Sequence, residues 1–165
     1  MSIWAENNGE KLIAAPKELN YLHRSKTIVQ SDLSAFDVYC QMTNDMSWLL
    51  KYAFKIRDKI STLAGVKKIN GFSATKPNKA PNIGEYLDFF LVEFISNDEI
   101  ILTSRDKHLS VMLFIKLKNN KTNKREFSIT TSVITHNLFG KLYMLPVAPT
   151  HNIIVRSAMK KITLK

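Results

Sequence analysis

Four β-type runs lie between Tyr86 and His136, separated by short polar breaks. Apolar and polar residues alternate in the last two runs, whereas the first two are apolar on both faces, which predicts that part of the sheet is covered twice. A period of two is typical of β-strands, whose successive side chains point to opposite faces of a sheet. The breaks are two turn-forming dipeptides, Asn97-Asp98 and Asp106-Lys107, and the segment 118–124 (KNNKTNK). The pattern therefore predicts an antiparallel meander of four strands, which we place at Tyr86–Ser96, Glu99–Arg105, His108–Lys118 and Lys124–His136.

The last two strands of this meander are predicted to differ between their two faces. One face is apolar on both strands, whereas the other carries polar side chains on the final strand, as expected where a sheet face meets water. The apolar face consists of Leu109, Val111, Leu113, Ile115 and Leu117 with Phe127, Ile129 and Val133, and the polar positions are Glu126, Ser128, Thr130 and Ser132.

The segments that flank the meander predict helices and one more strand. Tyr21–Gln30 is expected to form a strand, and a short helix follows to about Met42, with Ser31 or Ser34 as its N-cap. The clearest amphipathic pattern predicts a helix from Trp48 to Ala64 that covers the sheet.

After His136 the hydrophobic period becomes helical. A short helix capped by Asn137 is expected first, and Pro146 and Pro149 are expected to interrupt it. A final helix would then turn Ile154, Ala158 and Ile162 inward. The predicted fold class is α+β, with the element order β-α-α-β-β-β-β-α.

Length and composition indicate one soluble domain. The chain has 165 residues, of which we interpret 1–19 as an N-terminal extension and 20–165 as a single domain. Its net charge of +10 favours approach to anionic partners. Cys40 is the only cysteine, the N-terminus lacks the features of a secretory signal, and no apolar run would span a bilayer, so a cytoplasmic location is expected.

The predicted register brings several chemically active side chains to one end of the sheet. Asp106 is expected roughly opposite His136, and His108 opposite Ile134, within a slip of about two residues. A carboxylate that fixes the tautomer of a histidine would suit general acid–base catalysis by Asp106, His108 or His136. The alternative is structural: Asp106 bonds to turn amides, Asn137 caps a helix, and the histidines bond to backbone carbonyls.

Other chemistries have weaker support in the sequence. His108, His136, His151 and Asp106 have suitable atoms for zinc but lack a characteristic ligand spacing, so we predict no metal and no cofactor. Cys40 lies on an apolar helical stripe and is expected to be a core residue. The two basic segments lack interleaved aromatic residues, which makes a nucleic-acid partner the less favoured interpretation.

Three short motifs resemble those of a bacterial family described as domain of unknown function 2867. They are Asp106-Lys107-His108-Leu109, the segment 131–143 (TSVITHNLFGKLY) and Pro149-Thr150-His151. The sequence departs from the family pattern at Ser110, Met112 and Thr150, where relatives often carry Asp, Arg and an aromatic residue. The resemblance implies a START-like helix-grip fold, in which a curved antiparallel sheet wraps around a C-terminal helix and encloses an apolar cavity.

These observations favour a protein that binds a small hydrophobic or amphipathic ligand in a cavity between the sheet and the C-terminal helix. Two alternatives stay open: a cyclase- or hydrolase-like enzyme that uses an Asp/His pair, and a basic interaction module without a pocket. The oligomeric state is left undefined. The residues expected to bind the ligand are Trp48, Tyr52, Phe89, Leu91, Leu113, Phe127, Asn137, Leu142, Tyr143 and His151.

Overall fold

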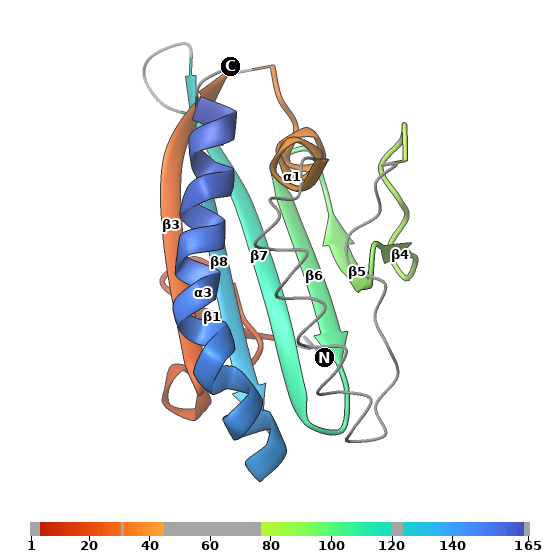
Figure 1. Cartoon of the computed structure of the whole chain (residues 1–165). Coiled ribbons are helices and arrows are strands. Elements are labelled where there is room, and N and C mark those ends of the chain that lie inside the picture. The colour runs from red at the N-terminus through yellow and green to blue at the C-terminus, as the bar shows by residue number, and fades with distance from the viewer. Residues whose placement is uncertain (1–3, 31, 45–76, 120–123, 164–165) are drawn as a thin grey trace.

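The computed structural model describes residues 4–30, 32–44, 77–119 and 124–163. It confirms an α+β fold, in which a six-stranded antiparallel sheet of order β3-β8-β7-β6-β5-β4 carries α1 and α3 on one face (Figure 1). The strands of this sheet are β3 (Tyr21–Gln30), β4 (Tyr86–Leu87), β5 (Phe90–Ile95), β6 (Glu99–Arg105), β7 (Leu109–Asn119) and β8 (Lys124–Thr135). The other elements are β1 (Ala5–Asn7), β2 (Glu10–Leu12), the 3-10 helix η1 (Pro16–Glu18), α1 (Ala35–Asn44) and α3 (Leu138–Thr163).

The meander of β5 to β8 has the predicted strand faces and the predicted turns at Asn97-Asp98 and Asp106-Lys107, and most of the third predicted turn lies outside the described residues. Leu109 pairs with Thr135, so the register differs by two residues from the predicted one and every side chain stays on its expected face. The prediction of one strand over Tyr86–Ser96 is wrong, because β4 and β5 are separate strands that pair with each other. Asp88 turns the chain between them with a φ of 58°, and the Tyr39 hydroxyl donates a hydrogen bond to its carboxylate over 2.6 Å.

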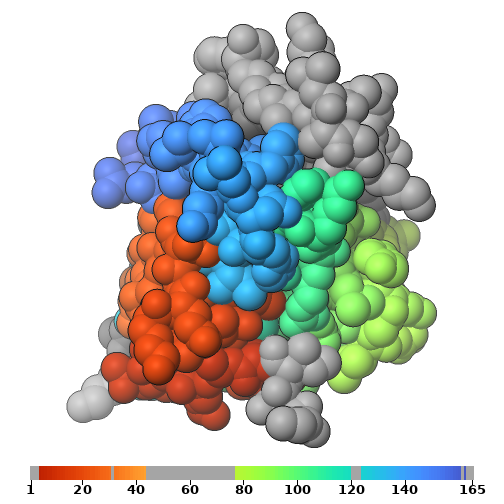
Figure 2. All heavy atoms as spheres, turned by 90° about the horizontal axis from the view of Figure 1, so that it is seen from below, coloured from red at the N-terminus to blue at the C-terminus, as the bar shows by residue number. Residues whose placement is uncertain are grey.

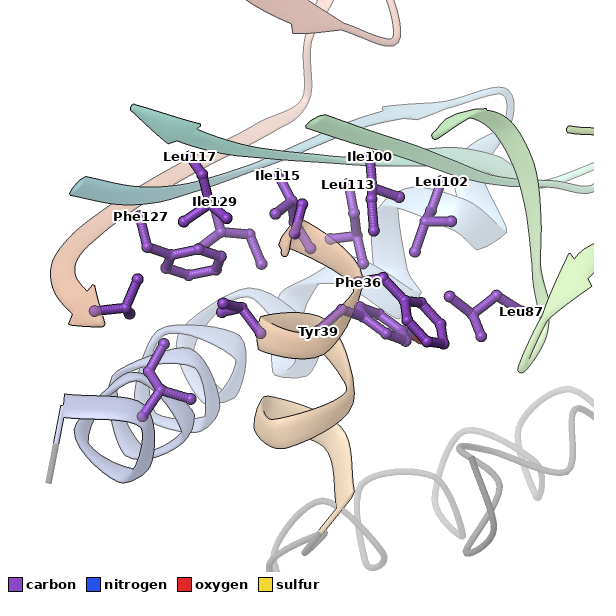
Figure 3. Close-up of a cluster of buried hydrophobic side chains, with 14 of the residues drawn as sticks. Phe36, Tyr39, Leu87, Ile100, Leu102, Leu113, Ile115, Leu117, Phe127 and Ile129 are labelled. Atoms are coloured by element: carbon purple, nitrogen blue, oxygen red, sulfur yellow. The ribbon is translucent and has the colours of Figure 1, made fainter. Parts of the chain in front are cut away.

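The main hydrophobic core lies between the sheet and the two helices. Figure 3 shows side chains of β6, β7 and β8 on the face of the sheet that meets the helices, with Ile100, Leu102 and Leu113 above Phe36 and Tyr39 of α1. The predicted N-cap of α1 is confirmed at Ser34, whose Oγ accepts from the Asp37 amide while the Asp37 carboxylate accepts from the Ser34 amide. The buried residues that α3 contributes to this core are Val155, Met159 and Ile162.

The opposite face of the sheet is covered by the N-terminal segment, contrary to the expectation that its polar residues meet water. Thr130 and Ser132 are buried, and they bond respectively to the Glu10 carboxylate and the Ile13 amide of this segment. Ile13 packs with Met112 and other apolar side chains in a second core. Figures 1 and 2 show the N-terminal segment, in red, and α3, in blue, on opposite sides of the sheet. Alternating hydroxyl residues thus bond to a covering segment here rather than to solvent.

A single helix of 26 residues ends the described chain, and the prediction that prolines interrupt it is wrong. Pro146 and Pro149 both lie inside α3, and the Thr150 hydroxyl bonds to the carbonyls of Pro146 and Val147. The inward face also differs, since Val155 and Met159 are buried where Ile154 and Ala158 are half-buried.

Two further sequence predictions concern the helix before the meander and the absence of a membrane span. The predicted helix Trp48–Ala64, with the expected ligand-binding residues Trp48 and Tyr52, lies outside the described part. No helix in the described part of the chain combines the length and hydrophobicity needed to cross a membrane.

Truncation of Ile13 tests whether the N-terminal segment is an integral part of the core. Ile13→Ala should lower the free energy of unfolding by about 2 to 4 kcal/mol, because it removes a buried side chain and leaves a cavity. The matched control Lys17→Ala, at an exposed position of the same segment, should change it by less than about 0.5 kcal/mol. Urea unfolding of both variants measures the two changes in the free energy of unfolding. Equal changes in Ile13→Ala and Lys17→Ala would contradict docking of the N-terminal segment on the sheet.

Candidate functional site

The junction of β7, β8 and α3 is held by backbone bonds and one asparagine side chain. The His136 amide donates to the His108 carbonyl over 2.7 Å. Asn137 Oδ1 accepts from the Gly140 amide over 3.0 Å, which confirms the predicted helix cap. The Asn137 amide nitrogen lies 3.0 Å from the Lys107 carbonyl and 2.9 Å from His108 Nδ1. Asn137 therefore ties the start of α3 to the β6–β7 turn.

Gly140 allows the first turn of α3 to lie directly on the strand backbone. A Cβ atom at this position would be 2.3 Å from the His108 carbonyl oxygen, far inside van der Waals contact. The residues His136, Asn137 and Gly140 of the H-N-x-x-G motif thus have a structural reason to occur together. They fix where α3 begins relative to the sheet.

The predicted Asp/His candidates lie at the expected end of the sheet but bond to different partners. Asp106 Oδ1 accepts from the amides of His108 and Leu109, over 2.7 and 2.9 Å, as in a turn. His136 Nε2 lies 2.8 Å from Ser110 Oγ, and His108 packs its ring on Phe139. The buried Nε2 of His108 has no hydrogen-bond partner among the described residues. These contacts favour a structural role for Asp106.

A second polar cluster, which the sequence did not predict, lies between β3 and α3. The Tyr21 hydroxyl is 3.0 Å from Asn152 Oδ1 and 3.2 Å from His151 Nδ1. The rings of His23 and His151 meet edge to face with centroids 5.5 Å apart. His23 Nε2 is also 3.1 Å from Ser25 Oγ. We call these five side chains the helix–strand polar cluster.

The surroundings of the two histidines favour their neutral forms. Burial, together with the nearby His23, lowers the pKa of His151 from 6.5 to about 4. Burial and the positive charge of Arg156 lower the pKa of His23, against a hydrogen bond that its ring donates to the Asn152 side chain, which raises it. At neutral pH the cluster therefore presents uncharged imidazoles beside one guanidinium.

Thr131 of β8 adds a buried hydroxyl next to this cluster. It is the register partner of His23 on one side and of Leu113 on the other, so the three side chains share the α3-facing side of the sheet. Thr131 is 2% exposed, and its Oγ1 has no hydrogen-bond partner among the described residues. A buried hydroxyl without a partner is energetically costly and is typical of a site that awaits a ligand or a water molecule.

The structure distributes the predicted ligand-binding residues over several environments. Of these residues, His151 joins the helix–strand polar cluster, and Asn137 belongs to the junction. Leu142 is 56% exposed. Leu113 and Phe127 are buried on the α3-facing side, whereas Phe89, Leu91 and Tyr143 are half-buried.

Sequence reasoning missed Tyr21, His23 and Thr131. A signal for the first two was present, since they stand two apart on a predicted strand and so share one face. What the sequence did not show was that residues about 130 positions away on α3 would cover that face. Thr131 lay unnoticed within an otherwise apolar face.

The described residues provide no evident metal centre, because no three or more His, Cys, Asp or Glu side chains gather closely enough to hold an ion. The fold and the cluster together define an α+β protein with a polar site set between a sheet and its C-terminal helix. The chain belongs to the family described as protein of unknown function (DUF2867), whose model matches residues 16–158. None of the curated proteins compared with the chain matches it.

Substitution of Gly140 tests the close approach at the junction. Helix propensity alone predicts that Gly140→Ala stabilises the protein by about 1 kcal/mol. The contact with the His108 carbonyl predicts the opposite sign, a loss of about 1 to 3 kcal/mol. Chemical denaturation measures the difference, with Lys141→Ala as the exposed neighbouring control. A stabilised Gly140→Ala protein would contradict the proposed packing.

Protonation of His151 should make the protein less stable in acid. Its folded pKa of about 4 lies below the ordinary 6.5, so the unfolded chain binds the proton more readily. The contribution of neutral His151 to the free energy of unfolding is fully present above pH 6.5. It is lost as the pH falls toward 4, which lowers the free energy of unfolding by about 2 to 3 kcal/mol. Urea unfolding at several pH values should show this loss in the wild type and a smaller one in His151→Gln. Parallel losses in both proteins would contradict the assignment.

Proposed function

We propose that this protein binds a small hydrophobic or amphipathic molecule between the α3-facing side of the sheet and α3. The observation that carries the proposal is the Thr131 hydroxyl, which is buried without a partner among the described residues and lies beside neutral histidines in a largely apolar layer. Convergence of a few polar groups in apolar surroundings is the usual composition of a small-molecule site. A polar group on the ligand would supply the missing hydrogen bond.

The apolar part of such a ligand would be bound by burial of its hydrocarbon. Thr131 is followed across the sheet by Leu113 of β7 and Leu102 of β6, so a row of side chains passes from polar to apolar within three strands. Burial of about 300 Å² of hydrocarbon contributes roughly 7 kcal/mol before the loss of translational freedom on binding is subtracted. This is enough for micromolar affinity only if the site is largely preformed.

The arrangement also supports a helix-grip, START-like interpretation of the fold. A long C-terminal helix lies along β3 on one side of an antiparallel sheet, as that architecture requires (Figure 1). Binding is favoured over acid–base catalysis because the Asp106 Oδ1 accepts from two turn amides. We further propose a cytoplasmic location, consistent with a single cysteine, Cys40.

Two neighbouring threonines provide a matched test of the proposed site. Thr131→Val removes the hydroxyl without a partner and should raise the free energy of unfolding of the ligand-free protein by up to about 1 kcal/mol. Thr130→Val removes a hydroxyl that bonds to Glu10 on the opposite face and should lower it by about 1 kcal/mol.

Ligand binding by the same variants can be measured through the fluorescence of the neutral apolar probe N-phenyl-1-naphthylamine. The wild type should bind the probe, and 1-decanol or decanoate should displace it. Thr131→Val should weaken decanol binding several-fold, while Thr130→Val leaves it unchanged. A protein that binds neither the probe nor either competitor would contradict the proposed function.

A further inference from the structure

Resting on the proposed function, we infer that the polar end of the ligand is a carboxylate, seated beside His23 and Thr131 and neutralised by Arg156. The hydrocarbon part would then extend over the apolar side chains of β7. The inference is carried by a lack of acidic residues around the helix–strand polar cluster within the described part of the chain, combined with hydrogen-bonding groups that converge there.

The elements that enclose the cluster carry no acidic residue near it. Neither β3 nor α3 contains Asp or Glu, and Glu126 is the only acid on β8. Glu126 pairs with Lys26, on the sheet face opposite the cluster. Arg156 has no carboxylate partner in the described part of the chain. Among the described residues, the charge that β3 and α3 place around the cluster is therefore positive.

Two other arginines of the sheet are paired with carboxylates. Arg125, on the same face but at the far end of β8, pairs with Asp98, and Arg24 on the opposite face pairs with Glu10. Lys160, one turn beyond Arg156 on α3, is exposed. Arg156, which is exposed as well, stands one helical turn after Asn152, whose Oδ1 accepts from the Tyr21 hydroxyl, and its charge lowers the pKa of His23. An anion at His23 would therefore meet an uncompensated guanidinium, which forms strong, directional hydrogen bonds with a carboxylate.

The neutral members of the cluster suit a monoanion better than a more highly charged group. Neutral His23 and His151 each carry one N–H donor, the Thr131 hydroxyl has no partner among the described residues, and Arg156 supplies one full positive charge. The Tyr21 hydroxyl already donates to Asn152 Oδ1. A carboxylate needs one compensating charge and several donors. A phosphate dianion would leave a negative charge in a half-buried layer, where desolvation is costly. These considerations select a carboxylate.

The strand pairing of β3, β8 and β7 indicates where the hydrocarbon part of the ligand would lie. His23, Thr131 and Leu113 stand side by side on β3, β8 and β7. Val111, two residues from Leu113 on the same face, is half-buried and so has surface left to cover. A molecule with its carboxylate at His23 and its hydrocarbon across Leu113 and Val111 would match this order of polar and apolar side chains. A medium-chain fatty acid has this chemistry.

The test compares two probes of equal chain length, decanoate and 1-decanol, by displacement of N-phenyl-1-naphthylamine at pH 7. The wild type should bind decanoate about tenfold more tightly than decanol, since a charge-assisted hydrogen bond is added. Arg156→Gln should abolish this preference while decanol binding is unchanged. The control Lys160→Gln removes an equal charge one turn away and should keep the preference.

The outcomes separate this inference from the proposed function. Equal affinities of the wild type for decanoate and decanol would overturn the carboxylate assignment and leave ligand binding intact. A preference that Lys160→Gln lowers as much as Arg156→Gln does would show a general charge effect and also overturn it. Absence of binding of either probe would refute the proposed function itself. Circular dichroism and urea unfolding of each variant exclude loss of the fold as the cause.

Discussion

The start of α3 against the ends of β7 and β8 is the constraint on which the rest of the structure depends. Gly140 lets the helix backbone contact the His108 carbonyl, and Asn137 fixes the direction in which the helix leaves the sheet. From that point α3 runs along β3, so that His151 and Asn152 lie against Tyr21 and Val155 joins the main core. A bulkier residue at 140 would change the position of every later contact of the helix.

The two faces of the sheet then serve different purposes. The face that the N-terminal segment covers has its hydroxyls bonded and its cations paired, as with Lys11, which pairs with Glu99 and lies 4.9 Å from the ring of Phe94. The face beneath α3 contains a hydroxyl without a partner among the described residues and a guanidinium without a carboxylate. Buried polar groups are normally satisfied, so the Thr131 hydroxyl is informative, whereas Arg156 is exposed and contributes only its charge.

Local patterns were sufficient to predict β3 and the strands β6 to β8, because alternation and turn dipeptides depend only on neighbouring residues. Asn97-Asp98 and Asp106-Lys107 gave the hairpins, and the register error of two residues kept every side chain on its correct face. One failure is local, the missed turn at Asp88 between β4 and β5, and the others involve distant contacts. Thr130 and Ser132 looked solvated because nothing nearby indicated that residues 10–13 would cover them. Pro146 and Pro149 looked like helix breakers, yet packing along β3 maintains one helix.

The candidate site shows the same limit. His136, Asn137 and His108 were found from spacing, and they form a structural junction rather than an evident catalytic centre. Tyr21, His23 and Thr131 become a site only when α3 is placed over them.

The most direct test is a crystal structure of the protein with decanoate. We predict carboxylate density beside His23 and Arg156 and an alkyl chain over Leu113. Ordered side chains that fill this layer completely, with decanoate absent or bound elsewhere, would contradict the account.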